Sequence, residues 1–144
     1  SSAASDVYKR QINNIIGNAA SNKFLEKLLT PTKIYVNEVL TLLENVEVNG
    51  MAHITGGGFE ENLSRINNNF TMNIDKTKWN MPQIFSEIQS LGNIDDKEMF
   101  KVFNCGIGYV LILTEDYAAK AKEINQSLIE IGFVTNESIK FKFI

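Results

Sequence analysis

Three consecutive glycines, Gly56, Gly57 and Gly58, constrain the fold of this chain more than any other stretch. Glycine destabilises a helix or strand by roughly 1 kcal/mol relative to alanine, so a run of three favours a turn in which the backbone takes a positive φ or closely approaches another group. Apolar residues before the run are typical of a short buried strand, and those after it recur at helical spacing. They are Met51, Ala52 and Ile54 before it, and Phe59, Leu63 and Ile66 after it. The segment is predicted to be strand, glycine turn and helix.

A helix that follows a glycine turn is suited to hold an anion. Its first N–H groups have no partner within the helix, and the positive end of the helix dipole lies behind them. Thr55 adds a hydroxyl to the same rim, and His53 adds a ring nitrogen. The spacing matches neither the GxGxxG fingerprint nor the P-loop. On these residues alone, a phosphate site and a tight turn without a ligand both stay open.

Six short motifs occur in a fixed order along the chain. They are 31–36 (PTKIYV), 53–58 (HITGGG), 61–65 with Glu61, Asn62 and Arg65, 79–85 with Trp79, Pro82 and Phe85, 98–99 (EM) and 103–108 (FNCGIG). In this order and spacing they resemble the C-terminal half of aminoimidazole ribonucleotide synthetase, the family also called phosphoribosylformylglycinamidine cyclo-ligase. The likeness runs from about Leu28 to about Leu113. The family usually ends in a segment that contains Ile-Gly-Glu, and this segment has no counterpart here. The last residues of the chain therefore resemble the family least.

The length of 144 residues suits one domain with a sizeable core. The fold expected is α+β, with a mixed sheet of about five or six strands that carries helices. Residues 1–11 are small and polar and are predicted to be a non-native or disordered leader. Residues 12–29 are expected to be an interdomain connector, and residues 30–144 a C-terminal synthetase-like domain. The resemblance implies that the family's N-terminal ATP-binding domain is absent from these residues.

Local signals predict the elements of the domain. After Pro31, Thr32 is expected to cap a helix whose apolar stripe (Val36, Val39, Leu40, Leu43) lies in the core. Asn49-Gly50 is predicted to join residues 46–48 and 51–54 in a hairpin. Residues 70–75 alternate like a half-exposed strand. Further elements expected are a helix from Pro82 to Gly92, a helix opened by Asp95 and Asp96, a strand at 109–113, a helix at 115–131, and strands at 133–134 and 139–143.

The resemblance implies that both glycine turns line one cleft shared with the missing domain. His53 is the catalytic candidate, and its role as acid, base, hydrogen-bonding group or structural residue stays open. Arg65 either forks onto phosphate or pairs with Glu61. Lys33 either faces a ligand or is a solvated charge. The candidate binding residues for substrate or phosphate are Thr55, Gly56, Gly57, Gly58, Asn62, Arg65, Asn104, Gly106 and Gly108.

Other function classes find less support in the sequence. A lone His makes a metal site less favoured than a hydrogen-bonding role, and the Asp95 and Asp96 pair is expected to cap a helix rather than hold Mg²⁺. Cys105, the one cysteine, is expected to be a buried packing residue rather than a nucleophile. A net charge of −3 gives no electrostatic case for nucleic acid. With neither a membrane-spanning run nor a signal peptide expected, the chain is predicted to be cytoplasmic.

The resemblance implies ATP-dependent closure of formylglycinamidine ribonucleotide to aminoimidazole ribonucleotide in purine biosynthesis. ATP and Mg²⁺ would bind mostly through the missing N-terminal domain, and the full-length enzyme would be a homodimer. This chain alone would then be inactive. The alternatives are a non-catalytic anion-binding module of the same fold, or another member of the superfamily that includes formylglycinamidine amidotransferase, selenophosphate synthetase and thiamine phosphate kinase. Motifs 31–36 and 53–62 favour the cyclo-ligase.

Overall fold

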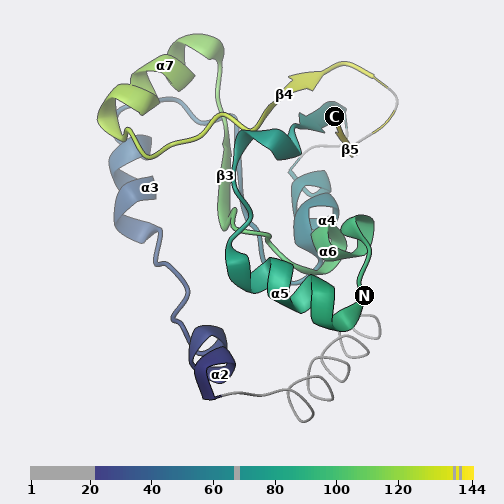
Figure 1. Cartoon of the computed structure of the whole chain (residues 1–144). Helices are drawn as coiled ribbons and strands as arrows, with labels where there is room; N and C mark the ends of the chain where they lie inside the picture. The colour runs from purple at the N-terminus through teal and green to yellow at the C-terminus, as the bar shows by residue number, and fades with distance from the viewer. Residues whose placement is uncertain (1–21, 67–68, 138, 140) are drawn as a thin grey trace.

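The computed structural model describes residues 22–66, 69–137, 139 and 141–144 (Figure 1). The predicted leader and the first half of the predicted connector therefore lie outside the described residues. The helices are α2 (Asn22–Leu28), α3 (Val36–Leu43), α4 (Gly58–Ser64), α5 (Gln83–Gly92), α6 (Asp96–Val102) and α7 (Glu115–Ile124), with a 3₁₀ turn at Lys76–Lys78. The strands are β1 (Gly50–His53), β2 (Thr71–Ile74), β3 (Tyr109–Ile112), β4 (Gly132–Thr135) and β5 (Phe141–Phe143).

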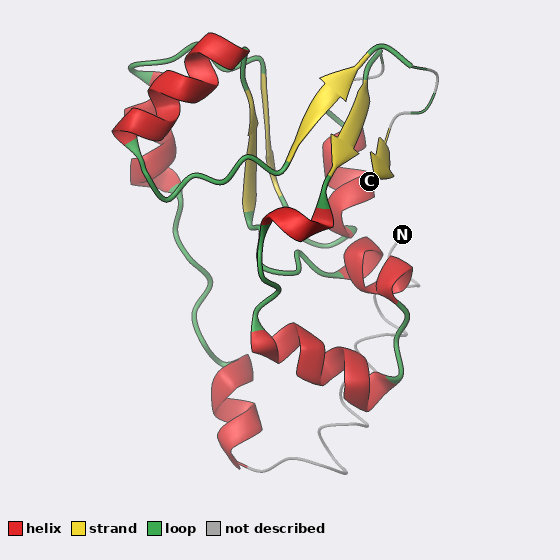
Figure 2. Cartoon of the chain, turned by 45° about the horizontal axis from the view of Figure 1, so that its top comes forward, coloured by secondary structure: helices red, strands yellow, loops and turns green. Residues whose placement is uncertain are grey.

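The described strands form two sheets, which Figure 2 shows in yellow. β1 and β3 pair antiparallel, with His53 opposite Tyr109. In the other sheet β2 is central, antiparallel to β4 and parallel to β5. The predicted α+β class with a mixed sheet is thus confirmed, with the strands divided over two sheets. Among the described residues, no helix has the length and apolar character that crossing a bilayer requires.

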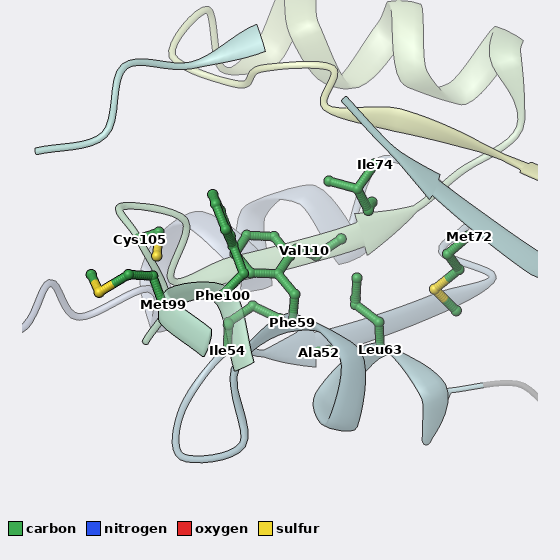
Figure 3. Packing of buried hydrophobic residues seen from close by; sticks show 10 residues of the cluster. All are labelled: Ala52, Ile54, Phe59, Leu63, Met72, Ile74, Met99, Phe100, Cys105 and Val110. Atoms are coloured by element: carbon green, nitrogen blue, oxygen red, sulfur yellow. The ribbon is translucent and has the colours of Figure 1, made fainter. Parts of the chain in front are cut away.

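The main core lies between α4, α6 and the two sheets. Phe59 on α4 is fully buried, and its ring lies 5.7 Å from Trp79, 5.7 Å from Phe100 and 6.0 Å from Phe143, measured between centroids. Figure 3 shows Phe59 and Phe100 side by side among the buried residues of this cluster. A smaller cluster of Leu42, Val46 and Ala121 joins α3 to α7. Phe59 therefore links the glycine turn directly to the core.

Several local predictions are confirmed. Pro82 precedes α5, which ends at Gly92. The side chain of Asp95 caps α6 by accepting the N–H of Glu98 at 2.9 Å, so the prediction of a cap is correct. Cys105 is fully buried, as expected for a packing residue. The predicted strands at 109–113 and near the C-terminus are present as β3, β4 and β5, with slightly different bounds.

The predicted hairpin around Asn49-Gly50 is wrong. β1 pairs with β3 instead, and the N–H of Asn49 donates to the carbonyl of Ile112 at 2.8 Å. Val46 is held in the turn that closes α3, because its N–H donates to the carbonyl of Leu42 at 2.9 Å and its side chain is buried beside Leu42. The residues before Asn49 are therefore engaged by α3 and do not pair with β1.

Two other boundaries differ from the prediction. α7 ends at Ile124, not residue 131, because the Asn125 side chain accepts the N–H of Ser127 and starts a turn. Gly132 does not stop a helix but begins β4, where a Cβ would lie 1.9 Å from the carbonyl oxygen of Asn73. Thr32 is not the helix cap, because α3 begins only after Tyr35.

β2 is buried on both faces rather than half-exposed. As the central strand it has β4 on one side and β5 on the other. Its polar Asn73 is 1% exposed and donates to the hydroxyl of Thr135 at 2.9 Å. A buried amide is tolerated when it is hydrogen-bonded, so alternation of polar and apolar residues did not mark a solvent-exposed face here.

The predicted core stripe of α3 is wrong for three of its four residues, and the fourth, Val39, is half-buried. Val36, Leu40 and Leu43 are 57%, 53% and 41% exposed, whereas Leu42 is 2% exposed. The helix thus packs on α7 through Leu42, a residue outside the predicted stripe.

Candidate functional site

Both glycine turns lie at the same end of the β1–β3 pair. β1 runs into the turn at 55–58, and the turn at 104–108 runs into β3. The two are joined by a hydrogen bond from the N–H of Ile54 to the carbonyl of Gly108 at 2.8 Å. Long-range strand pairing therefore brings together two motifs that are far apart in the sequence.

The turn at 55–58 is fastened from within by Asn62. Its side-chain amide donates to the carbonyls of Gly58 at 2.7 Å, Gly56 at 3.3 Å and Thr55 at 3.4 Å. Asn62 is 7% exposed, so it holds the shape of the turn from the protein side. The N–H of Gly58 donates to the carbonyl of Thr55 at 3.0 Å and is thus used inside the turn.

The two sides of this turn differ in the space around them. A Cβ on Gly58 would lie 2.1 Å from the carbonyl oxygen of Phe100, so the turn packs directly on the backbone of α6. A Cβ on Gly56 would meet nothing within 4 Å. Gly57, between them, is the N-cap residue of α4, with φ of 95°. The turn is therefore anchored at Gly58 and open at Gly56, beside the exposed Thr55.

The turn at 104–108 is closed by its own side chains and by the 79–82 segment. The Asn104 side-chain oxygen accepts the N–H of Gly106 at 3.1 Å, and the Trp79 indole N–H donates to the carbonyl of Cys105 at 3.0 Å. Burial raises the pKa of the Cys105 thiol to about 12, with a smaller contribution from the charge of Asp96. The thiol is therefore protonated at neutral pH and serves packing, not nucleophilic chemistry.

Three rings gather beside the joined turns. His53 and Tyr109 face each other across β1 and β3 with centroids 5.9 Å apart, and Tyr35 lies 6.0 Å from His53 and 5.7 Å from Tyr109. We call these three residues the ring cluster. Tyr35 also covers Gly108, where a Cβ would lie 2.1 Å from the phenolic oxygen. Tyr109 reaches this place through strand pairing, so no local sequence signal marks it as part of the site.

Two predicted basic residues are engaged in ion pairs. Arg65 pairs with Glu61 on α4, which is the alternative that sequence reasoning left open. Arg65 directly follows the last residue of α4, and the Glu61 carboxylate that it pairs with lies against Gly57, where a Cβ would be 2.1 Å from Oε2. Lys33 pairs with Glu38 at 2.9 Å, and its ammonium lies 5.4 Å from the centre of the Tyr35 ring. The structure thus places Lys33 beside the ring cluster, and it places the ion pair of Arg65 and Glu61 against Gly57 of the turn.

Acidic residues do not gather at this site. Within residues 22–66, 69–137, 139 and 141–144, no three His, Cys, Asp or Glu side chains are grouped to hold a metal ion. Asp95 is used as a helix cap, and Asp96 accepts a hydrogen bond from Gln89 at 2.7 Å. The described residues therefore do not fit a Mg²⁺ ligand set, and we assign the ion to none of them.

We expect Asn62→Ala to lower the free energy of unfolding by about 2 kcal/mol, because three buried or half-buried carbonyls lose their donor. Urea denaturation measures this change. The matched control is Asn45→Ala, since the Asn45 amide also donates to a backbone carbonyl but is exposed. A loss for Asn62→Ala no larger than that of the control would show that the turn does not depend on this side chain.

Comparisons with known proteins give a consistent result. The family described as "AIR synthase related protein, C-terminal domain" matches residues 6–142. Phosphoribosylformylglycinamidine cyclo-ligase of Geotalea daltonii is 47% identical over 122 residues, which cover 80% of this chain and 33% of that protein. The protein of the same name from Methanococcus maripaludis is 53% identical over 100 residues, 69% of this chain and 28% of the relative. The one from Clostridium acetobutylicum is 47% identical over 117 residues, 78% of this chain and 35% of the relative. The chain spans about a third of the length of these curated relatives.

Proposed function

The chain belongs to the AIR synthase related family, as a C-terminal domain, and from this premise we propose that it is the substrate-holding part of a phosphoribosylformylglycinamidine cyclo-ligase. The proposed reaction converts formylglycinamidine ribonucleotide and ATP to aminoimidazole ribonucleotide, ADP and phosphate, in purine biosynthesis. The single observation that carries the assignment to a site is the turn at 55–58, open at Gly56 and placed beside His53 by β1.

In this proposal the open side of the turn holds the substrate phosphate or a developing oxyanion. The backbone N–H groups of Gly56 and Gly57 and the hydroxyl of Thr55 are the donors, since a glycine turn before a helix offers N–H groups to an anion. Gly58 and Asn62 keep the turn in shape from the other side. Asn104, Gly106 and Gly108 form the second wall through the turn that they build.

His53 is proposed to orient the substrate rather than to hold a metal ion. Its ring is exposed and lies against Tyr109 and Tyr35, which restrict how the imidazole can turn. Positioning of this kind contributes to the rate because ring closure requires the amidine nitrogen to be held close to the activated formyl carbon. The ring cluster thus fixes the geometry in which His53 meets a substrate at the turn.

The remaining parts of the enzyme are proposed to lie in the N-terminal region that the relatives possess. We place ATP and Mg²⁺ there, together with the homodimer contacts, and we propose a cytoplasmic enzyme that needs this region for turnover. Residues 30–144 are proposed to be the C-terminal domain, with residues 12–29 as a connector. Arg65 is proposed to have an indirect role in substrate binding. It holds the side chain of Glu61 on α4 through their ion pair.

The test uses a chimera in which this chain replaces the C-terminal third of the Geotalea daltonii relative. We expect phosphate release that depends on ATP and formylglycinamidine ribonucleotide. Gly56→Val is expected to raise the KM for the ribonucleotide at least about tenfold, equivalent to about 1.4 kcal/mol of binding, because its side chain fills the open space at the turn. Gly56→Ala, with a smaller side chain, is the graded control and should give an intermediate KM.

The unfolding midpoint of both variants should stay at the wild-type value, since a Cβ at Gly56 contacts nothing within 4 Å. An unchanged KM in Gly56→Val would place the substrate elsewhere. A folded chimera that releases no phosphate would favour the non-catalytic binding module instead.

A further inference from the structure

Helix α3 carries one wide apolar face, of which only one edge packs inward. Five of its eight residues, VNEVLTLL, are Val or Leu. On the inner side Leu42 is 2% exposed and packs with Val46 and Ala121. Val36, Leu40 and Leu43 recur at i, i+4 and i+7, so they form one line on the helix surface, which we call the α3 stripe. The apolar face of an amphipathic helix is normally covered by the core, but here only its Leu42 edge is covered and the α3 stripe is not.

The α3 stripe is exposed along its whole length. Val36 is 57% exposed, Leu40 53% and Leu43 41%, although no charged residue separates them on this side of the helix. Ile34, directly before the helix, is 82% exposed. In Figure 1, α3 lies at the left margin of the molecule below α7, with β3 on its inner side. The stripe thus has the composition of a contact surface and no partner among the described residues.

The same surface continues to the candidate site. Tyr35 precedes α3 and packs on Tyr109, whose hydroxyl lies 3.2 Å from the sulfur of Met51. Met51 is itself 40% exposed on β1, two residues before His53. Whatever covers the α3 stripe therefore lies next to the ring cluster and the open turn.

We propose that the α3 stripe is the docking surface for the N-terminal region of the full-length protein. The chain spans about a third of the length of its relatives and matches a C-terminal domain, so those relatives have a preceding region long enough to cover the stripe. This inference rests on the proposed function, in which the N-terminal region must bring ATP beside His53. A region seated on the stripe meets that requirement because the stripe leads to the ring cluster.

The test measures how fast a thiol in the stripe reacts. Leu40→Cys places it there, and Ile129→Cys is the matched control, because these residues are 53% and 52% exposed. Cys105 is the one native cysteine of the chain, and its burial keeps it unreactive, so it also reports whether the domain stays folded. Each variant is labelled with iodoacetamide as the isolated chain and within the Geotalea daltonii chimera, and mass spectrometry reads each peptide.

We expect Leu40→Cys to react at least tenfold more slowly in the chimera than in the isolated chain, with Ile129→Cys unchanged. Equal rates for Leu40→Cys in a chimera with unreactive Cys105 would overturn the proposal. So would protection of Leu40→Cys that appears in the isolated chain as its concentration rises, because the occupant would then be a second copy. A chimera in which Cys105 becomes reactive also counts against it, since docking on a built surface does not unfold the domain.

Phosphate release by the same chimera distinguishes a failure of the docking surface from a failure of the proposed function. An active chimera with a reactive Leu40→Cys thiol overturns only the docking surface. An inactive chimera with a protected thiol keeps the docking surface and overturns the catalytic assignment.

Discussion

Gly58→Val is expected to lower the free energy of unfolding by about 3 kcal/mol or more, the largest loss that we expect from one added side chain in this domain. Gly58 has φ of 57°, a conformation that is strained for a β-branched residue. Its Cβ would also lie 2.1 Å from the carbonyl oxygen of Phe100 and 2.6 Å from the carbonyl carbon of Lys101, and backbone atoms of α6 cannot rotate away as a side chain would. The variant must separate α4 from α6 in order to fold.

Urea denaturation followed by circular dichroism measures this loss, and Gly56→Val is the matched control. The same side chain is added two residues earlier, where φ is not in the left-handed region and a Cβ contacts nothing within 4 Å. We expect the control to change the free energy of unfolding by less than about 0.5 kcal/mol. Similar losses for both variants would show that the glycine run is needed as a whole and not for close packing at Gly58.

Phe59→Ala is expected to cost about 3–5 kcal/mol of folding free energy, the usual range for a fully buried phenylalanine. The Phe59 ring is 0% exposed and contacts the rings of Trp79, Phe100 and Phe143 from three other segments. Its removal leaves a cavity that these rings cannot fill without moving the backbone of α4 or α6. The near-ultraviolet circular dichroism of Trp79 should weaken as well, because the indole loses its stacked neighbour.

The matched control is Phe133→Ala, because Phe133 lies on β4 and is 55% exposed. Its expected cost is less than about 1 kcal/mol, since half of its surface is already in water. A cost for Phe59→Ala within about 1 kcal/mol of the control would mean that the aromatic cluster is not the centre of the core.

These two variants also bear on the function. Gly58 and Phe59 are the first two residues of α4, so the turn that is proposed to hold the substrate is built directly onto the core. Asn62, on the next turn of the same helix, donates back to the carbonyls of Gly56 and Gly58. The shape of the open side at Gly56 thus depends on residues that lie on the buried side of the turn.

Much of the candidate site could be predicted because its signals are local. The glycine run, His53 before it and the second turn at 104–108 can each be recognised from a few consecutive residues. The ion pair of Arg65 with Glu61 follows from helical spacing, and it was one of two open interpretations. Tyr109 could not be predicted, because it reaches the site through its register with His53 and not through neighbours in the sequence.

The sequence by itself determined the family, the α+β class, the strand, turn and helix around the glycines, the helix that starts at Pro82 and the cap at Asp95. Each of these depends on backbone preferences or hydrogen bonds within a few residues, which a short stretch of chain encodes completely. Only the tertiary structure decided that β1 pairs with β3, that β2 is buried on both faces, and that Leu42 rather than Leu40 enters the core. Those outcomes depend on which distant surfaces meet, because the apolar face of α3 is wide enough that either of its edges, at Leu42 or at Leu40, could pack inward.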